Sequence, residues 1–255
     1  EPMTTWRDEF EQEFLEELMW GEGLRYAHEQ PRCSTCHIFC CWECGDFMEC
    51  SDCCLRRHQT MPLHVIQAWN GSFWQKTTLA NMGLIYQVGH GGHPCVHPDP
   101  VVRSMVVVDE IIHTIRYRYC SCRGLRSVNP VRQLLRNRWY PATVAEPETV
   151  FTFRALDAFR LASVHANVNV NNWLKAIEER TDALKLGKVP DRRAGFHRAF
   201  RQYSFLLRSK RFGRGNDPSG LRGTQQGQLA LRCWACPREG VNLPDGWKDV
   251  DESEA

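Results

Sequence analysis

The sequence lacks any long apolar run and carries little net charge. No segment resembles a secretory signal or a membrane-spanning helix, so nothing in it points to a secreted or membrane protein. The formal net charge is only +2, which excludes a chain-wide basic field for nucleic acid. The glycines at residues 89–92 are not followed by Lys-Ser or Lys-Thr, which excludes a phosphate-binding loop.

The chain is instead rich in cysteine and histidine, with 13 Cys and 10 His. Three Cys-x-x-Cys pairs and two His lie close together: Cys33, Cys36, Cys41, Cys44, Cys50, Cys53, His58 and His64. Each such pair presents two thiolates to one tetrahedral ion. The spacing is typical of cross-braced zinc modules. In these, the first and third pairs share one ion, and the second pair shares the other with the two His.

Disulfide bridges are the alternative for these cysteines. The number of cysteines is odd, no secretory signal is evident, and bridges have no need of His, so zinc is favoured. Thiolate ligands also indicate a reducing compartment. Cys40 and Cys54 stand next to expected ligands, and each is either a substitute ligand or a spare thiol.

A second metal site is expected around Cys120 and Cys122. Two cysteines separated by one residue at the end of a strand place both thiols on one face. Two sets could complete the tetrahedron: His90 and Cys95 from the preceding loop, which we favour, or Cys233 and Cys236 from the C-terminal segment. Ordinary buried cysteines are the plain alternative. His93, His97 and His113 are weaker candidates.

The hydrophobic pattern predicts an α+β chain in five parts. These are an acidic amphipathic N-terminal helix (1–30), a cross-braced zinc module (31–69), a β-rich region with the C-x-C site (70–128), a helical and basic region (129–214), and a linker with a Cys-x-x-Cys segment (215–255). The first residue is Glu rather than Met, so we expect a segment of a longer protein.

Several elements are predicted more closely. Trp6, Phe10, Phe14 and Leu18 recur every four residues, which predicts a helix whose apolar face docks on the rest of the domain. Residues 105–108 form a β-branched run typical of a buried strand, and residues 111–119 alternate like a half-exposed one. Apolar residues from Phe151 onward predict a helical face, followed by helices over 170–185 and 192–212.

The order of motifs resembles the C-x-C-type (second class) cysteine-cluster domain found N-terminal to the catalytic domain of fungal Kyakuja–Dileera–Zisupton (KDZ) transposases. The resemblance covers roughly residues 6–247. The residues that carry it are 50–55, 58, 62–64, 69, 73, 89–90, 95, 109, 112–113, 120–122, 133–136, 139–143, 151–153, 180–182, 216–220, 233–237 and 242–244.

This resemblance implies a zinc-chelating accessory domain of a DNA transposase, encoded by a transposable element and located in the nucleus. It also implies that the metal-dependent nuclease core lies downstream and is absent from this chain, which would then be noncatalytic. We expect about two to three structural zinc ions.

Three functions are weighed. DNA targeting or assembly is supported by a basic stretch without acids, in which the candidate phosphate contacts are Arg198, Arg201, Arg208, Lys210, Arg211 and Arg214. The simpler alternative is that these cations form the solvated face of a helix or make ion pairs with the acidic N-terminal helix. A zinc-dependent module that binds a peptide or chromatin partner is the second function. An enzyme is disfavoured, because a catalytic zinc needs an open position and a nearby base.

Overall fold

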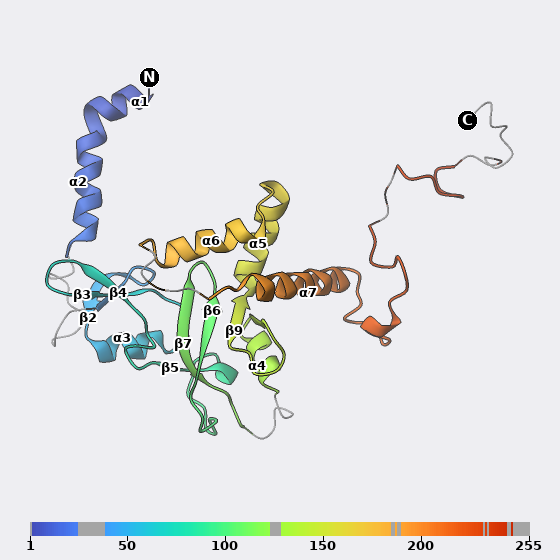
Figure 1. Ribbon diagram of the computed structural model, residues 1–255, viewed down its shortest axis with the longest axis horizontal. Coiled ribbons are helices and arrows are strands. Elements are labelled where there is room, and N and C mark those ends of the chain that lie inside the picture. Colours follow the sequence, from blue (N-terminus) through green and yellow to red (C-terminus); the bar gives the residue numbers. More distant parts are fainter. Residues whose placement is uncertain are drawn as a thin grey trace. The chain divides into compact units, whose positions relative to one another are not determined.

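The computed structural model describes residues 2–24, 39–122, 129–184, 187, 190–231, 233, 235–243 and 246. Two compact units, Glu1–Arg201 and Gln202–Ala255, make up the chain and are described separately. Two sheets and several helices confirm the predicted α+β class (Figure 1). The acidic C-terminal residues 247–255 lie outside the described residues.

The N-terminal helix forms as predicted, but its apolar face does not dock. It consists of α1 (Pro2–Thr5), a π-helical turn (Trp6–Phe10) and α2 (Glu11–Glu22). Phe14 and Leu18 remain 52% and 70% exposed, so the expectation of docking is wrong for the described part of the chain. The rings of Trp6 and Phe10 pack along the helix against Phe14 instead, with centroids 6.2 and 6.3 Å away.

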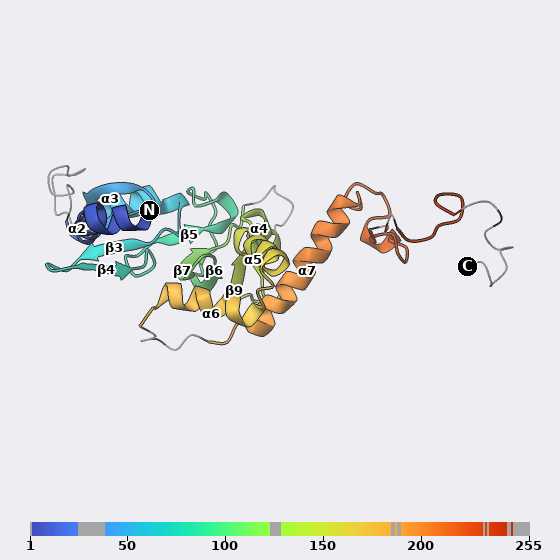
Figure 2. The same ribbon diagram turned by 90° about the horizontal axis from the view of Figure 1, so that it is seen from above.

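A small antiparallel sheet carries the first cysteine-rich region. Its strands are β1 (Phe39–Cys41), β2 (Gly45–Glu49), β3 (Ile66–Trp69) and β4 (Trp74–Thr77), in the order β2-β1-β3-β4. Helix α3 (Ser51–Arg57) and a 3-10 turn (His58–Thr60) lie beside it (Figure 2). Buried Cys41, Cys54, Ile66 and Leu79 form its core. Since β4 pairs with β3, this sheet continues past the boundary predicted at residue 69.

A five-stranded mixed sheet forms the larger core, in the order β5-β7-β6-β9-β8. Its strands are β5 (Ile85–Gln87), β6 (Arg103–Val108), β7 (Ile112–Arg118), β8 (Trp139–Pro141) and β9 (Thr149–Thr152). Met105, Val107 and Val108 of β6 are buried, as the β-branched run predicts, and β7 alternates between buried and exposed residues from Thr114 to Tyr117. A 3-10 turn (Val88–His90) follows β5 and leads into the loop that carries Cys95.

The helices follow mainly in the second half of the chain. They are α4 (Pro130–Arg136), α5 (Phe153–His165), α6 (Val170–Thr181) and α7 (Arg193–Arg211). Residues 129–214, expected to be helical and basic, contain these four helices and also the strands β8 and β9. Val150 and Phe151 pair in parallel with β6, and the helix begins only at Phe153. Thr152 sets that start, since its hydroxyl accepts a hydrogen bond from the Ala155 N–H at 3.0 Å.

The second unit contains the end of α7, a series of turns and a 3-10 turn (Leu221–Gly223). Its best-anchored side chain is Arg214, which donates to the Asp217 carboxylate at 2.6 Å, to the Ser219 hydroxyl at 2.9 Å and to the Gly220 carbonyl at 2.5 Å. These bonds tie the chain that follows α7 into a compact turn. Among the described residues no helix is both long and apolar enough to cross a bilayer.

Candidate metal centre

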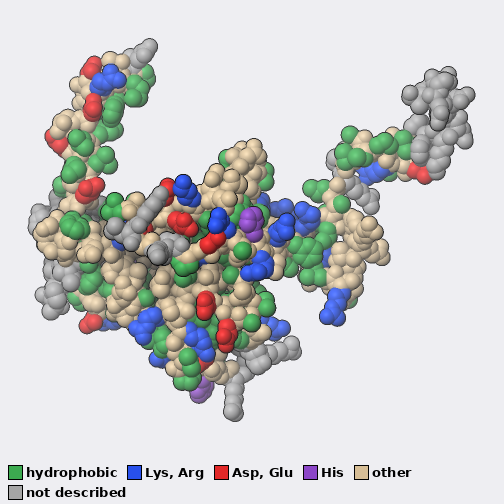
Figure 3. All heavy atoms as spheres, in the orientation of Figure 1, with side chains coloured by type: hydrophobic (Ala, Val, Ile, Leu, Met, Phe, Trp, Pro, Cys, Tyr) green, Lys and Arg blue, Asp and Glu red, His purple; other side chains and the backbone are tan. Residues whose placement is uncertain are grey.

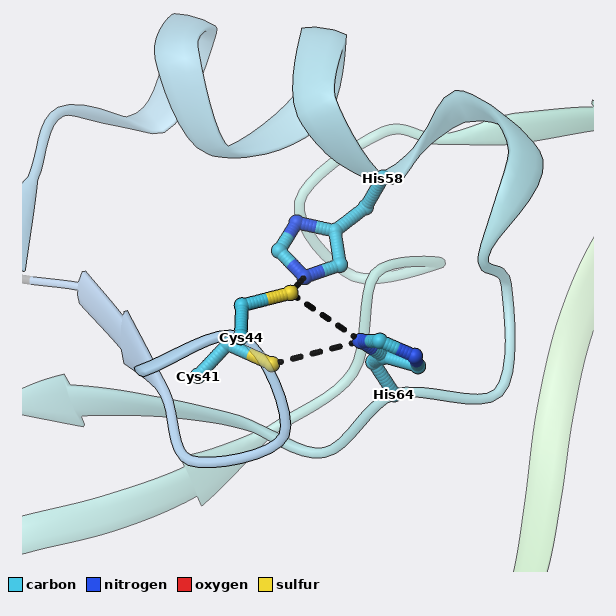
Figure 4. A group of neighbouring side chains, drawn as sticks. All are labelled: Cys41, Cys44, His58 and His64. Carbon is cyan, nitrogen blue, oxygen red and sulfur yellow. Dashed lines mark hydrogen bonds between the residues drawn. The ribbon is translucent and has the colours of Figure 1, made fainter. Parts of the chain in front are cut away.

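Four predicted ligands meet at one point of the small sheet. Cys41 ends β1, Cys44 closes the turn after it, His58 follows α3, and His64 lies on the loop before β3. The Nδ1 atom of His64 lies 3.4 Å from the Cys41 Sγ and 3.3 Å from the Cys44 Sγ, and the Nε2 atom of His58 lies 3.5 Å from the Cys44 Sγ. Figure 4 shows the four side chains turned toward one another.

These separations suit a tetrahedral zinc ion. With Zn–S bonds of about 2.3 Å and Zn–N bonds of about 2.0–2.1 Å, sulfur and nitrogen atoms at neighbouring vertices stand about 3.5 Å apart. All four ligand atoms lie within 4.8 Å of one another. The group is also the second Cys pair combined with the His pair, as the cross-brace pattern predicts. That it binds zinc stays a prediction.

The surroundings of the two histidines suit them to bind a cation. Burial lowers the pKa of both His58 and His64, which favours the neutral ring whose lone pair a metal needs. The Nδ1 of His58 lies 2.8 Å from the Cys54 carbonyl, so this nitrogen donates its proton there and Nε2 is left for a metal. Burial raises the pKa of the Cys41 thiol, which a bound cation would offset.

The other half of the predicted cross-brace is only partly described. Cys33 and Cys36 lie outside the described residues. Cys50 and Cys53 flank the first turn of α3 and are half-buried, and Arg56 donates to the Cys53 Sγ at 3.2 Å. The site proposed for these two pairs therefore stays a prediction.

Neither spare cysteine belongs to the four-residue group. The Cys40 Sγ lies 3.9 Å from the Gln67 amide oxygen, on another part of the sheet. Cys54 is fully buried beside Glu49 and His58. Burial raises its pKa to about 12, with a further contribution from the Glu49 carboxylate, so Cys54 is a neutral thiol in the core.

The second cluster unites His90, Cys95, Cys120 and Cys122, the set favoured from the sequence. The His90 Nε2 lies 3.1 Å from the Cys120 Sγ and 3.7 Å from the Cys122 Sγ, and the Cys95 and Cys122 sulfurs are 3.5 Å apart. Hydrogen bonds from Cys120 and His90 lower the pKa of Cys122 to about 6, so this thiol is ready to ligate as a thiolate. These four ligand atoms also suit a tetrahedral zinc ion of their own.

A buried glutamine holds Cys120 in place, and the sequence alone did not reveal this role. The Gln133 side chain on α4 accepts from the Cys120 N–H at 2.8 Å and donates to the Cys120 carbonyl at 3.0 Å. Gly89 lets the chain pass next to this pair. A Cβ atom at residue 89 would lie 2.4 Å from the Cys120 Cβ and 2.7 Å from the Gln133 Oε1. Only glycine fits there without a shift of the cluster.

The supports of the two clusters are in direct contact. Gly92, at φ +88°, packs so closely on the turn after His58 that an added Cβ would lie 2.2 Å from the Gln59 carbonyl oxygen and 2.6 Å from the Thr60 Cα. The loop that carries His90 and Cys95 thus rests on the turn that presents His58.

The weaker histidine candidates lie outside both groups, and the pair Cys233 and Cys236 belongs to the other unit. Cys233 and Cys236 are exposed in the second unit and interact with each other, which lowers the pKa of Cys233. His93 and His97 belong to no group of potential ligands among the described residues. His113 is partly buried on β7, and burial lowers its pKa to about 4.

The basic residues of the predicted nucleic-acid surface divide into exposed and buried ones. Lys and Arg side chains gather along α7 (Figure 3), where Arg198 and Arg201 are exposed in the first unit. Arg208, Lys210 and Arg211 are exposed in the second. Arg214 must be removed from the set, because its side chain is 4% exposed and its guanidinium is held by Asp217, Ser219 and Gly220.

Residues 79–185 match the family described as CxC2-like cysteine clusters associated with KDZ transposases. The resemblance expected from the sequence is thereby confirmed for this part of the chain, which contains the whole second cluster. The family description names a cysteine cluster that accompanies transposases, rather than a transposase itself. No curated protein and no solved structure matches the chain.

Proposed function

Since residues 79–185 match the cysteine clusters associated with KDZ transposases, we propose that this chain is a noncatalytic, zinc-stabilised accessory module that helps such a transposase engage DNA in the nucleus. The observation that carries the proposal is the cluster of His90, Cys95, Cys120 and Cys122, because it lies wholly within the matched residues.

The proposed role of zinc is structural. Each cluster offers four Cys or His side chains, which would fill a tetrahedral ion and leave no vertex for a catalytic water. Asp109, an acidic residue that lies near the Cys120 and Cys122 pair in the sequence, is 2% exposed and already accepts from Thr152 and Arg154. Both features support a scaffold rather than an enzyme.

The proposed DNA contact rests on the basic end of α7. Arg208 and Arg211 are three residues apart on one helix, so their side chains are neighbours on its surface. Among the described residues, neither forms an ion pair with an acidic side chain, which leaves both available for phosphates. Phe205 and Phe212 are exposed nearby in the same unit, 48% and 38% respectively, and can stack on bases.

The test is fluorescence anisotropy of the zinc-loaded chain with a labelled DNA duplex over a series of salt concentrations. We expect affinity to fall as salt rises, because phosphate contacts release counterions. The double variant Arg208→Ala/Arg211→Ala removes two such contacts. Its plot of log K against log salt should therefore be shallower by about 1.8, at about 0.9 per contact.

A matched control removes two exposed cations elsewhere, in the variant Arg7→Ala/Lys175→Ala. It should bind DNA like the wild type. Equal weakening in both variants would show a diffuse charge effect and contradict a surface on α7. If the zinc-loaded chain does not bind DNA even at low salt, the proposed DNA contact is wrong, whereas the proposed structural role of zinc is unaffected.

A further inference from the structure

A cavity of about 760 Å³ lies next to the second cluster, with Cys120 in its lining. It is lined by the start of β6, the end of β7, the start of α4, and the loop before β9. Residues that matter for its chemistry are two tyrosines, one arginine and three carboxylates: Tyr117, Tyr119, Arg103, Asp99, Glu146 and Glu148. All of them lie within the first unit.

Two aromatic rings form the wall of this cavity. Tyr117 and Tyr119 are 3% and 6% exposed, and their rings pack edge to face with centroids 5.1 Å apart. The Tyr119 hydroxyl is buried and completes no hydrogen bond of normal geometry with any described residue, although it interacts with the Tyr117 hydroxyl. A buried hydroxyl on a cavity wall without a full partner is a place where a polar ligand atom gains a bond.

The wall already binds one cation. The Arg103 guanidinium lies over the Tyr119 ring, 5.5 Å from its centroid, and donates to the Asp99 carboxylate at 2.9 Å. Stacking on a tyrosine face combined with pairing to a carboxylate is how proteins hold guanidinium and ammonium groups. Arg103 neutralises only one of the three carboxylates.

Glu146 and Glu148 supply the remaining negative charge. Both side chains are exposed, and neither forms an ion pair with a described residue. Their loop is held in position: the Glu148 carbonyl accepts from the Val106 N–H at 2.8 Å, and the Ala142 N–H donates to the Thr149 carbonyl at 2.9 Å. Glu146 has a φ of +45°, a conformation that costs energy in a non-glycine residue and persists only where the surroundings fix it.

We propose that this aromatic and acidic cavity binds the cationic side chain of a basic peptide, an arginine or a lysine, between the tyrosine wall and the carboxylates of Glu146 and Glu148. The cavity goes beyond the proposed function and does not depend on it, because α7 contributes nothing to its lining. An anionic partner such as DNA is disfavoured here, since three carboxylates outweigh the single Arg103.

The test uses three peptides with blocked ends that differ only at their central residue, which is Arg, Lys or Gln. Each is titrated into the full zinc-loaded chain, and the ring proton signals of Tyr117 and Tyr119 are followed by NMR. We expect saturable shifts with the Arg or the Lys peptide and none with the neutral Gln peptide. No shift with either cationic peptide, or equal shifts with all three, would overturn the proposal.

Two variants locate the binding. Glu146→Gln/Glu148→Gln changes two exposed side chains, so folding should be retained, and binding should weaken about threefold or more. Tyr119→Phe keeps the ring and removes only the hydroxyl, and it should also weaken binding. Glu9→Gln, which removes one carboxylate on the N-terminal helix, should leave binding unchanged. If Glu9→Gln weakens binding as much as the cavity variants do, the cavity is not the site.

Discussion

At the scale of single residues, Asp109 joins two parts of the larger core. It is 2% exposed at the end of β6, and it accepts from the Thr152 hydroxyl at 2.5 Å and from the Arg154 Nε at 3.2 Å. Thr152 in turn caps α5. Burial alone would raise the pKa of Asp109, but the bonds from Arg154 and Thr152 outweigh it and hold the pKa below the usual value.

Replacing this carboxylate should therefore destabilise the fold. Asp109→Asn loses hydrogen bonds to a charged acceptor, so the free energy of unfolding of the zinc-loaded chain at pH 7 should fall by about 1.5–3 kcal/mol. Because the folded pKa is depressed, the stabilisation is present above the unfolded pKa of about 4 and is lost as pH falls through the lower folded value. The variant should lack that acid-range loss.

Urea unfolding at a series of pH values measures both effects. Asp157→Asn is the matched control, because Asp157 forms a surface pair with Arg160, with an N–O distance of 3.4 Å, and should cost less than about 1 kcal/mol. Equal losses for the two variants would contradict the role assigned to Asp109.

At the scale of elements, the sequence predicts what is local and misses what depends on topology. The alternation in β7 and the β-branched run in β6 identify those strands, because the side-chain pattern directly reflects burial. Strand β9 is missed because Val150, Phe151 and Thr152 are all buried and continue into the apolar face of α5. A continuous apolar run cannot distinguish a buried strand from a helix.

The same distinction holds for the clusters. Spacing alone pairs Cys41 with Cys44 and Cys120 with Cys122, because each pair lies on one turn or one strand end. The clamp by Gln133 could not be predicted, since it requires α4 to lie against the end of β7. The close approach of Gly89 to Cys120 likewise arises from two segments that meet only in the fold.

That close approach makes a second prediction. Gly89→Ala should push Cys120 and Gln133 apart, because the added methyl group would lie 2.4 Å from the Cys120 Cβ. We expect loss of about one zinc ion from the second cluster, measured by metal analysis of the purified chain, with the first cluster still loaded. Gly215→Ala is the matched control, since nothing lies within 4 Å of a Cβ at that position. Full zinc content in Gly89→Ala would show that the site tolerates the shift.

At the scale of the whole molecule, the metal should decide how much of the chain is folded. The small sheet has a core of few residues around Cys41, Cys54, Ile66 and Leu79, whereas the five-stranded sheet buries a much larger set. Removing zinc with a chelator should therefore melt the region around residues 39–77 first, because metal binding supplies much of the folding free energy of such modules.

Hydrogen exchange measured before and after chelation checks this order of loss. Metal analysis should find about two to three ions per chain, and Cys44→Ser and Cys120→Ser should each lose one, while Cys40→Ser should keep all of them. Unchanged exchange throughout residues 39–77 in the chelated sample would show that this region does not need metal.

The contact of Gly92 with Gln59 and Thr60 bears on how the chain would fill with zinc. Metal bound to His58 would order the turn after it, and this turn would stabilise the loop that carries His90 and Cys95. Metal bound to His90 and Cys95 would stabilise the turn after His58 in the same way. The two centres would then load cooperatively. Each centre would then bind zinc more tightly when the other is filled, and at excess zinc either centre could still hold its ion alone.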